Sequence, residues 1–342
     1  MRGNSRAIFG LVVLVAAGCA AAAASAAGPA AAAPANAPAS WQSPDPDALP
    51  NNAFGGSVRL GRDLIAHTSV LLGPDAADPR ERFAGNGLDC ASCHLKAGMQ
   101  RFALPLVGIW RTYPAFSARL GKIETMTERV NDCMERSMNG RPLPANGPDM
   151  RAILAYLQFI GSVPDTETPF WGHGVPKLRL PDHAADPGHG RAVYRTMCAA
   201  CHGPAGAGVR YSASEQRRQQ RRYLYPPLWG PDSYNDGAGM ARNITAAWFV
   251  HANMPDGVTF ADPILSVDDA YDVAAYVNQH PRPNKARLDA DYPDRWLKPP
   301  DAAFPPLLGP FPPLQHALGP WRPISEWLKA HSPTRASPPA VD

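Results

Sequence analysis

The apolar residues of this chain recur at helical spacing in four short segments. In each segment they lie three or four positions apart, which is the period of a helix with one buried face. The stripes run through Val58, Gly61, Leu64, Ile65 and Thr68; through Met150, Ile153, Leu154 and Leu157; through Gly190, Ala192, Val193 and Met197; and through Val273, Tyr276 and Val277. A cap-like polar run from Ser266 to Asp269 precedes the last stripe. The pattern predicts a mostly α-helical protein.

Proline and glycine are frequent between these helices. The 342-residue chain contains 39 prolines and 29 glycines. Such a composition argues against long strands or extended bundles, and it indicates short helices joined by irregular chain. The length suits two domains of ordinary size.

Each half of the chain contains one C-x-x-C-H motif, at 90–94 and at 198–202. This is the attachment signature of haem c, in which two thiols one helical turn apart form thioethers and the adjacent imidazole binds the iron. A pair of zinc-binding or redox-active C-x-x-C elements is the alternative. Because a histidine follows both motifs, we predict two covalently bound haem c groups. Their attachment residues are Cys90, Cys93, Cys198 and Cys201, and their proximal iron ligands are His94 and His202.

The same order of predicted helices surrounds each motif, so the chain contains an internal repeat. One helix precedes each motif and one follows it, and Tyr156 and Tyr276 are at equivalent places in the later helices. A glycine on the first helix and an aromatic on the last are typical of the crossing terminal helices of class I cytochromes c. We therefore predict two such domains in tandem, at 51–165 and 185–288, with a linker at 166–184 and a proline-rich C-terminal segment at 289–342 that wraps over them.

The N-terminus has the pattern of a secretory signal. Arginines flank an apolar run, 7–17, that is too short to span a bilayer, and small residues follow it. We expect a signal peptide at 1–27, or a lipoprotein signal to residue 18 with a lipid anchor at Cys19. A disordered linker, 28–50, follows, and we expect no transmembrane span in the mature chain. The expected location is the periplasm.

The net charge of +3 falls to about +1 without the signal, because two of the 33 Lys and Arg residues and none of the 30 Asp and Glu residues lie in it. This near neutrality argues against a general nucleic-acid surface. One dense basic run contains Arg217, Arg218, Arg221 and Arg222. It is either a solvated surface run or a docking site for an acidic partner.

The sixth iron ligands are the next question, because they set the haem potentials. For the second haem we predict Met254, which lies shortly before the last helix where class I cytochromes present this ligand, with Met240 as the alternative. The first domain contains several methionines and the unassigned Cys133. Cys133 is either a small buried hydrophobe or a thiolate that binds iron or acts as a nucleophile, and spacing alone leaves both open.

The residues around Cys133 carry a more specific signal. The run Asn131-Asp132-Cys133-Met134-Glu135-Arg136-Ser137-Met138-Asn139-Gly140 resembles the signature of dihaem thiosulfate dehydrogenases, which are tetrathionate-forming periplasmic cytochromes. Similar stretches are present at 97–100, 229–240, 253–255 and 292–296, so the resemblance covers most of the chain.

The resemblance implies a role for each of these residues. His94 and Cys133 would ligate the first, catalytic haem, and His202 and Met254 the second, which passes electrons out. The electron acceptor would be a periplasmic small cytochrome c or high-potential redox protein. Some family members have lysine at the position of Asn253, so plain His/Met ligation is expected here. The residues implied to line the substrate pocket are Arg119, Arg129, Arg136, Ser137 and Gln100.

The implied chemistry gives these arginines a physical reason. Two thiosulfate dianions about 5 Å apart repel by roughly 3 kcal/mol even in water. Arginines offset this repulsion because they stay charged and grip oxyanions with paired hydrogen bonds. Each could instead form a salt bridge with one of the neighbouring acidic residues, Glu124, Glu128, Asp132 or Glu135. We further hypothesise that Cys133 transiently bonds the sulfane sulfur of one thiosulfate, which a second thiosulfate then attacks.

Other functions remain compatible with the motifs. The chain could be a dihaem electron carrier without a substrate, although a carrier gains nothing from a labile cysteine ligand. The same site could run in reverse as a tetrathionate reductase, or attach thiosulfate to a carrier protein as related sulfur-oxidation cytochromes do. A dihaem peroxidase fits less well, because peroxide would damage a distal cysteine.

Overall fold

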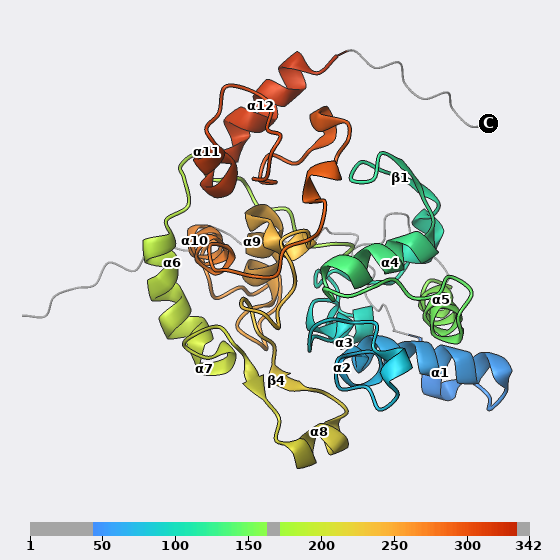
Figure 1. Cartoon of the computed structure of the whole chain (residues 1–342). Coiled ribbons are helices and arrows are strands. Elements are labelled where there is room, and N and C mark those ends of the chain that lie inside the picture. Colours follow the sequence, from blue (N-terminus) through green and yellow to red (C-terminus); the bar gives the residue numbers. More distant parts are fainter. Residues whose placement is uncertain (1–43, 163–171, 334–342) are drawn as a thin grey trace, which may run out of the picture.

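The computed structural model describes residues 44–162 and 172–333, and it places two helical units one after the other along the chain (Figure 1). In the first unit α1 (Ala53–Ala66) packs across α5 (Pro148–Ile160). In the second unit α10 (Val267–Asn278) packs against both α6 (Pro187–Val193) and α9 (Asn243–Asn253). The predicted mostly helical architecture is therefore confirmed.

Short elements connect these helices. Two antiparallel pairs, β1 (Ala115–Ser117) with β2 (Lys122–Glu124) and β3 (Val209–Arg210) with β4 (Tyr223–Tyr225), form hairpin-like loops. The further α-helices are α2 (Thr68–Leu71), α3 (Leu95–Gly98), α4 (Met126–Arg136), α7 (Ala199–His202), α8 (Ala213–Gln219), α11 (Pro313–Leu318) and α12 (Trp321–His331). A π-helix spans Tyr194–Cys198, and 3-10 turns span Pro46–Ala48, Pro79–Glu81, Cys90–Ser92, Ile109–Thr112, Gly239–Ala241, Leu288–Ala290 and Arg295–Leu297.

A glycine lies at each of the two helix crossings. A Cβ atom on Gly61 would lie 2.0 Å from the carbonyl oxygen of Ala152 and 2.7 Å from Cβ of Tyr156. A Cβ atom on Gly190 would lie 2.0 Å from the carbonyl oxygen of Asp272. No side chain fits at either position, so the close approach of the helices requires glycine. The ring of Tyr156 is fully buried beside the first crossing, and its hydroxyl donates to the carbonyl of Ala97 at 2.9 Å.

Replacing Gly61 by alanine should destabilise the first unit by about 1–3 kcal/mol, because the helices must separate to admit the methyl group. Gly56 lies on the same helix with open space around its Cβ position, so Gly56→Ala is the matched control. Gly56→Ala should raise the free energy of unfolding by about 0.5–1 kcal/mol, since alanine is the better helix former. Thermal unfolding of the holoprotein measures both changes, and equal effects of the two variants would contradict the crossing argument.

The C-terminal segment packs against the second unit. Trp321 and Ile324 of α12 are fully buried, and the Trp321 ring lies 5.5 Å from that of Tyr271 on α10. The described part of this segment ends at residue 333. The predicted signal region, Cys19 and most of the linker 28–50 lie outside the described residues, as do 166–171 of the predicted linker 166–184. Among the described helices, none combines the length and the apolar character that crossing a membrane would need.

Residues 229–241 of the second unit extend into the first. Tyr234 and Ala238 belong to the hydrophobic core that α1, α4 and α5 form. Asn235 donates to the carbonyl of Glu135 at 2.8 Å, and Asn86 donates to the carbonyl of Ser233 at 3.1 Å. This shared core fixes the two units relative to each other.

Candidate functional site

A cavity of about 960 Å³, including its open mouth, lies in the first unit beside the first C-x-x-C-H motif. Cys90, Cys93 and His94 form one part of its wall, and Cys133 of α4 forms another. The rest of the wall is largely apolar, and includes Leu64, Ile65, Leu72, Leu88, Leu106, Ile109, Val130, Ile153 and Leu157. Such a wall excludes water and suits a large apolar ligand.

The His94 side chain is held in the form that binds metals. Its Nδ1 lies 2.5 Å from the carbonyl oxygen of Leu104, and a carbonyl can only accept, so Nδ1 carries the proton. The Nε2 lone pair is therefore available to a metal. Burial lowers the pKa of His94, which keeps the ring neutral as a ligand must be. Burial also raises the pKa of the Cys90 and Cys93 thiols to about 12.

The second unit repeats this arrangement. A cavity of about 1590 Å³, which opens to solvent, is lined by Cys198, Cys201 and His202. Nδ1 of His202 donates to the carbonyl of Pro226 at 2.8 Å, and burial lowers the pKa of His202. Both units thus present two cysteines and one oriented, neutral imidazole to an apolar cavity. This donor set fits a covalently attached haem in each unit.

Both candidate methionines lie on the wall of the second cavity. Met254 follows α9 directly and its backbone N–H donates to the carbonyl of Val250 at 2.9 Å. Met240 lines both cavities and packs against both neighbouring cores. The geometry alone therefore leaves the choice between them open.

The two cavities adjoin each other. Five residues line both of them: Leu88, Asp89, Cys93, Tyr234 and Met240. The two cavities therefore share part of one wall.

Helix α4 carries Cys133 into the first cavity. The helix begins at a capping box, in which the Thr125 hydroxyl accepts from the N–H of Glu128 and the Glu128 carboxylate accepts from Thr125. Arg129 lies one turn before Cys133 and Ser137 one turn after it, so all three line the same cavity. Negative charge on the Cys133 sulfur is the largest cause that raises the pKa of Arg129 above its usual value.

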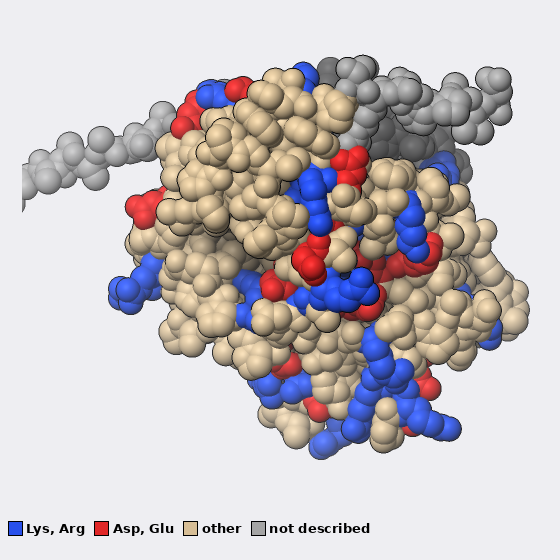
Figure 2. All heavy atoms as spheres, turned by 45° about the horizontal axis from the view of Figure 1, so that its top comes forward, with Lys and Arg blue, Asp and Glu red and all other residues tan. Residues whose placement is uncertain are grey.

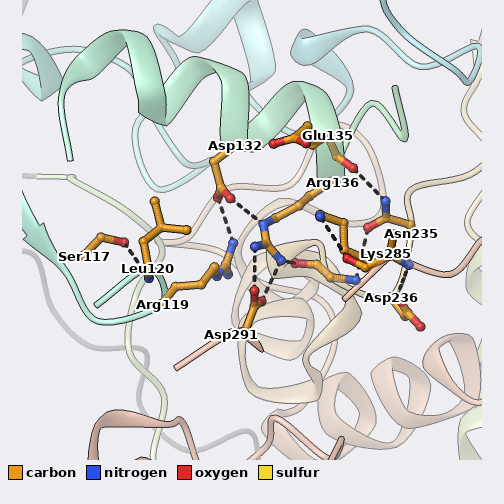
Figure 3. Close-up of polar contacts among 12 residues, drawn as sticks. Ser117, Arg119, Leu120, Asp132, Glu135, Arg136, Asn235, Asp236, Lys285 and Asp291 are labelled. Carbon is orange, nitrogen blue, oxygen red and sulfur yellow. Dashed lines mark hydrogen bonds and ion pairs between the residues drawn. The ribbon is translucent and has the colours of Figure 1, made fainter. Parts of the chain in front are cut away.

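The other predicted arginines face a carboxylate instead of the cavity (Figure 3). Asp132 accepts hydrogen bonds from Arg119 at 3.1 Å, from Arg129 at 3.0 Å and from Nε of Arg136 at 2.5 Å. The guanidinium of Arg136 also donates two hydrogen bonds to Asp291, at 2.6 and 2.8 Å. Burial acts to raise the pKa of Asp132, but the charges of Arg136 and Arg119 outweigh it and lower that pKa.

The predicted site residues are thus only partly brought together. Cys133, Arg129 and Ser137 line the first cavity. Arg119 and Arg136 do not line it and form ion pairs with Asp132 instead. Gln100 lies at the contact between the units and donates to Asn253 at 3.1 Å. Asn253 in turn donates to the carbonyl of Phe102 at 2.9 Å, so the residue before Met254 is bound to the first unit.

Asp132 was among the acidic residues named as alternative salt-bridge partners of the arginines, and the structure pairs all three arginines with it. Arg129 and Arg136 lie three and four positions from Asp132 on α4, at the spacing of helical ion pairs. Asp291 is 155 positions from Arg136 and gave no local signal. Tyr234 was also not singled out as a residue between the two cavities.

Comparison with known proteins gives two family matches. Residues 81–162 match the family described as "SoxA/TsdA, cytochrome c domain", and residues 188–281 match the cytochrome c family. The two predicted cytochrome c domains in tandem are therefore confirmed. Together with the two C-x-x-C-H motifs they imply two haem c groups.

Relatives match over most of the chain. A protein named thiosulfate dehydrogenase from Allochromatium vinosum is 41% identical over 239 residues, which are 69% of this chain and 82% of that protein. Another protein of that name, from Psychrobacter arcticus, is 36% identical over 73% of this chain and 71% of its own length.

A solved structure also matches. The chain titled thiosulfate dehydrogenase (TsdBA) from Marichromatium purpuratum, in its "as isolated" form, superimposes with a TM-score of 0.64 at 37% identity. The match covers 73% of the present chain and 51% of that one, so this chain spans about half the length of that structure.

Proposed function

Because the chain belongs to the family of dihaem thiosulfate dehydrogenases, we propose that it oxidises two thiosulfate ions to one tetrathionate ion. The observation that carries this proposal is the position of Cys133, which shares one apolar cavity with the first haem-attachment motif and with Arg129. A carrier that only relays electrons has no need of a cysteine and an arginine at that place.

Two haem c groups would be held by the residues of the two cavities. Cys90, Cys93 and His94 would bind the first, with Cys133 as its sixth ligand. The second would be bound by Cys198, Cys201, His202 and Met254. Each haem, when bound, accepts and passes on one electron, so two haems match the two electrons that the reaction releases.

The Cys133 sulfur supplies the nucleophile in this mechanism. It forms a bond to the sulfane sulfur of one thiosulfate, and two electrons leave, which gives a cysteine S-thiosulfonate. The sulfane sulfur of a second thiosulfate attacks this adduct at the sulfur next to its sulfonate. The bond to Cys133 breaks, tetrathionate departs and the cysteine thiolate is restored. No proton needs to move in either step.

Arg129 and Ser137 orient the substrates. Both line the cavity on either side of Cys133, and their N–H and O–H groups can donate to the sulfonate oxygens. The positive charge of Arg129 offsets the repulsion between two dianions, roughly 3 kcal/mol at 5 Å in water. Asp132 holds Arg129, Arg119 and Arg136 as one cluster, so the last two act as positioning residues. Gln100 connects this unit to Asn253 beside Met254.

The function is tested with the purified holoprotein, thiosulfate and ferricyanide. We expect one tetrathionate for each two ferricyanide ions reduced, in the absence of any carrier protein. A dihaem carrier would reduce no ferricyanide with thiosulfate. A cytochrome that transfers thiosulfate to a carrier would form no tetrathionate, and either result would overturn the proposal.

Replacing Met254 by leucine should lower the potential of the second haem, within the roughly 0.8 V range that axial ligands span. Leucine keeps the apolar volume but has no sulfur lone pair. Met240→Leu is the matched control, because Met240 lines the same cavity and should leave the potential unchanged. Redox titration of the holoprotein measures both, and the opposite outcome would assign Met240 as the ligand.

We also propose that the protein is exported to the periplasm. The support is the apolar run 7–17 behind two arginines, followed by small residues. Sequencing the N-terminus of the protein purified from its native cells tests this, and it also separates cleavage near residue 27 from lipidation at Cys19. An intact Met1 would contradict the proposal.

A further inference from the structure

The segment from Val209 to Tyr225, here called the basic arm, has a charge that the proposed reaction does not use. It contains five arginines and one acidic residue, Glu215. Without it the chain has 28 Lys and Arg residues against 29 Asp and Glu residues. The excess of basic over acidic residues in the sequence therefore lies in this one short segment. The arginines of the arm are Arg210, Arg217, Arg218, Arg221 and Arg222.

The base of the arm is anchored to the protein. The N–H of Arg222 donates to the Ser69 hydroxyl at 3.2 Å, and its guanidinium lies 3.3 Å from Asp75. Arg210 pairs with Asp232 at 3.0 Å. Gly87 packs so closely that a Cβ atom there would lie 2.5 Å from the Arg222 side chain. The arm consequently has a fixed position against the first unit.

The tip of the arm presents its charge to solvent. Helix α8 forms the tip, and Glu215 is engaged there in the capping box with Ser212. Arg217 follows on the same helix and is exposed. Figure 1 places α8 at one end of the molecule and α12 at the other. Figure 2 shows blue Lys and Arg side chains at the lower end of this face and also across its centre, where red Asp and Glu side chains lie among them.

The arm also borders the second cavity. Arg221, Tyr223 and Leu224 line that cavity together with the second haem-attachment motif. Leu224 is 45% exposed and Val209 is 36% exposed, so apolar surface accompanies the charge. Complexes that transfer electrons are small and short-lived, and complementary charge steers the partners together. Apolar surface among basic residues, bordering the cavity that would hold the second haem, meets these requirements.

We propose that the basic arm is the docking surface for a small acidic electron-transfer protein, which receives electrons from the second haem. This inference rests on the proposed function, in which electrons leave through the second unit. In each encounter one electron passes from the reduced haem to the oxidised metal centre of the acceptor. No bond forms or breaks, and no proton moves.

The test uses one acceptor protein in two charge states. Mitochondrial cytochrome c is basic, and succinylation of its lysines makes the same protein acidic. Binding to the oxidised holoprotein is measured by calorimetry at low ionic strength. We expect the succinylated form to bind and the native form not to bind. Added salt should weaken this binding, since salt screens exposed charges.

Two double variants locate the contact. Arg217→Gln with Arg218→Gln should weaken binding of the succinylated protein about five- to tenfold, because two steering charges are lost. Arg322→Gln with Lys329→Gln removes the same charge from α12 at the opposite end and should change binding less than twofold. Equal binding of both acceptor forms, or equal loss in both variants, would overturn the proposal. So would binding of the arm to vesicles of anionic lipid without binding to the acidic acceptor.

Electron transfer is then measured without thiosulfate. Dithionite reduces the holoprotein, excess reductant is removed, and mixing with oxidised succinylated cytochrome c gives a second-order rate constant. The arm variant should lower this constant about five- to tenfold at low salt. Because dithionite supplies the electrons, a failure of thiosulfate oxidation would leave this result unaffected, so the two proposals fail independently.

Discussion

Replacing Cys133 by glycine should abolish thiosulfate oxidation while both haem groups stay attached. The attachment cysteines lie elsewhere in the chain, at 90, 93, 198 and 201, so covalent haem content is expected to be unchanged. The nucleophilic sulfur and the proposed sixth ligand of the first haem are both lost. Removal of a catalytic nucleophile costs far more than a factor of about 100 in turnover. Steady-state assay with ferricyanide measures the loss.

The matched control for this variant is Val130→Gly. Val130 lies on the same helix and lines the same cavity. Both variants therefore lose the roughly 1 kcal/mol of helix stability that a glycine costs. It should retain most of the activity. Low-temperature spectra of the oxidised haems should change in Cys133→Gly and not in Val130→Gly. Normal thiosulfate oxidation by Cys133→Gly would show that the sulfur has no part in the reaction.

Replacing Arg136 by glutamine should destabilise the protein by about 3–5 kcal/mol. Its side chain is only 5% exposed and is shared between Asp132 and Asp291. Both carboxylates are buried, and removal of one partner leaves a buried charge without compensation. Chemical unfolding of the holoprotein, followed by circular dichroism, measures the change.

Arg119→Gln is the control for Arg136→Gln. Arg119 donates to the same carboxylate, but Asp132 keeps Arg129 and Arg136 when Arg119 is removed. The loss should therefore be no more than about 1 kcal/mol. Asp291→Asn combined with Arg136→Gln should be less destabilising than the sum of the single changes, because the pair is coupled. A raised KM for thiosulfate without loss of stability would instead make Arg136 a substrate contact.

The helical fold could be predicted because its determinants are local. The 3.6-residue period identified α1, α5, α6 and α10 but not α4, α9 or α12, and Gly61 and Gly190 marked the crossings that only glycine allows. The C-x-x-C-H motifs marked the attachment points, since their chemistry requires adjacent residues. Ser266 was expected to cap the last helix and forms a capping box with Asp269.

The surroundings of the site could not be predicted in the same way. A sequence pattern shows that Arg119, Arg129 and Arg136 lie near Cys133, but not which of them faces the cavity. That depends on rotation about the helix axis and on where distant carboxylates fold. Asp132 lies on the same side of α4 as Arg136 and accepts a hydrogen bond from it. Asp291 belongs to the C-terminal segment and accepts a hydrogen bond from the same guanidinium. Tyr234 similarly enters the first core from the other half of the chain.

The core shared through residues 229–241 also limits how modular this protein can be. The repeat suggests two interchangeable halves, yet Tyr234 and Ala238 complete the core of the half to which they do not belong in sequence. A fragment that ends at the linker would lack part of its own interior and expose apolar surface there. Chimeras between relatives must therefore exchange 229–241 together with the first half, so the two domains have to be engineered as one unit.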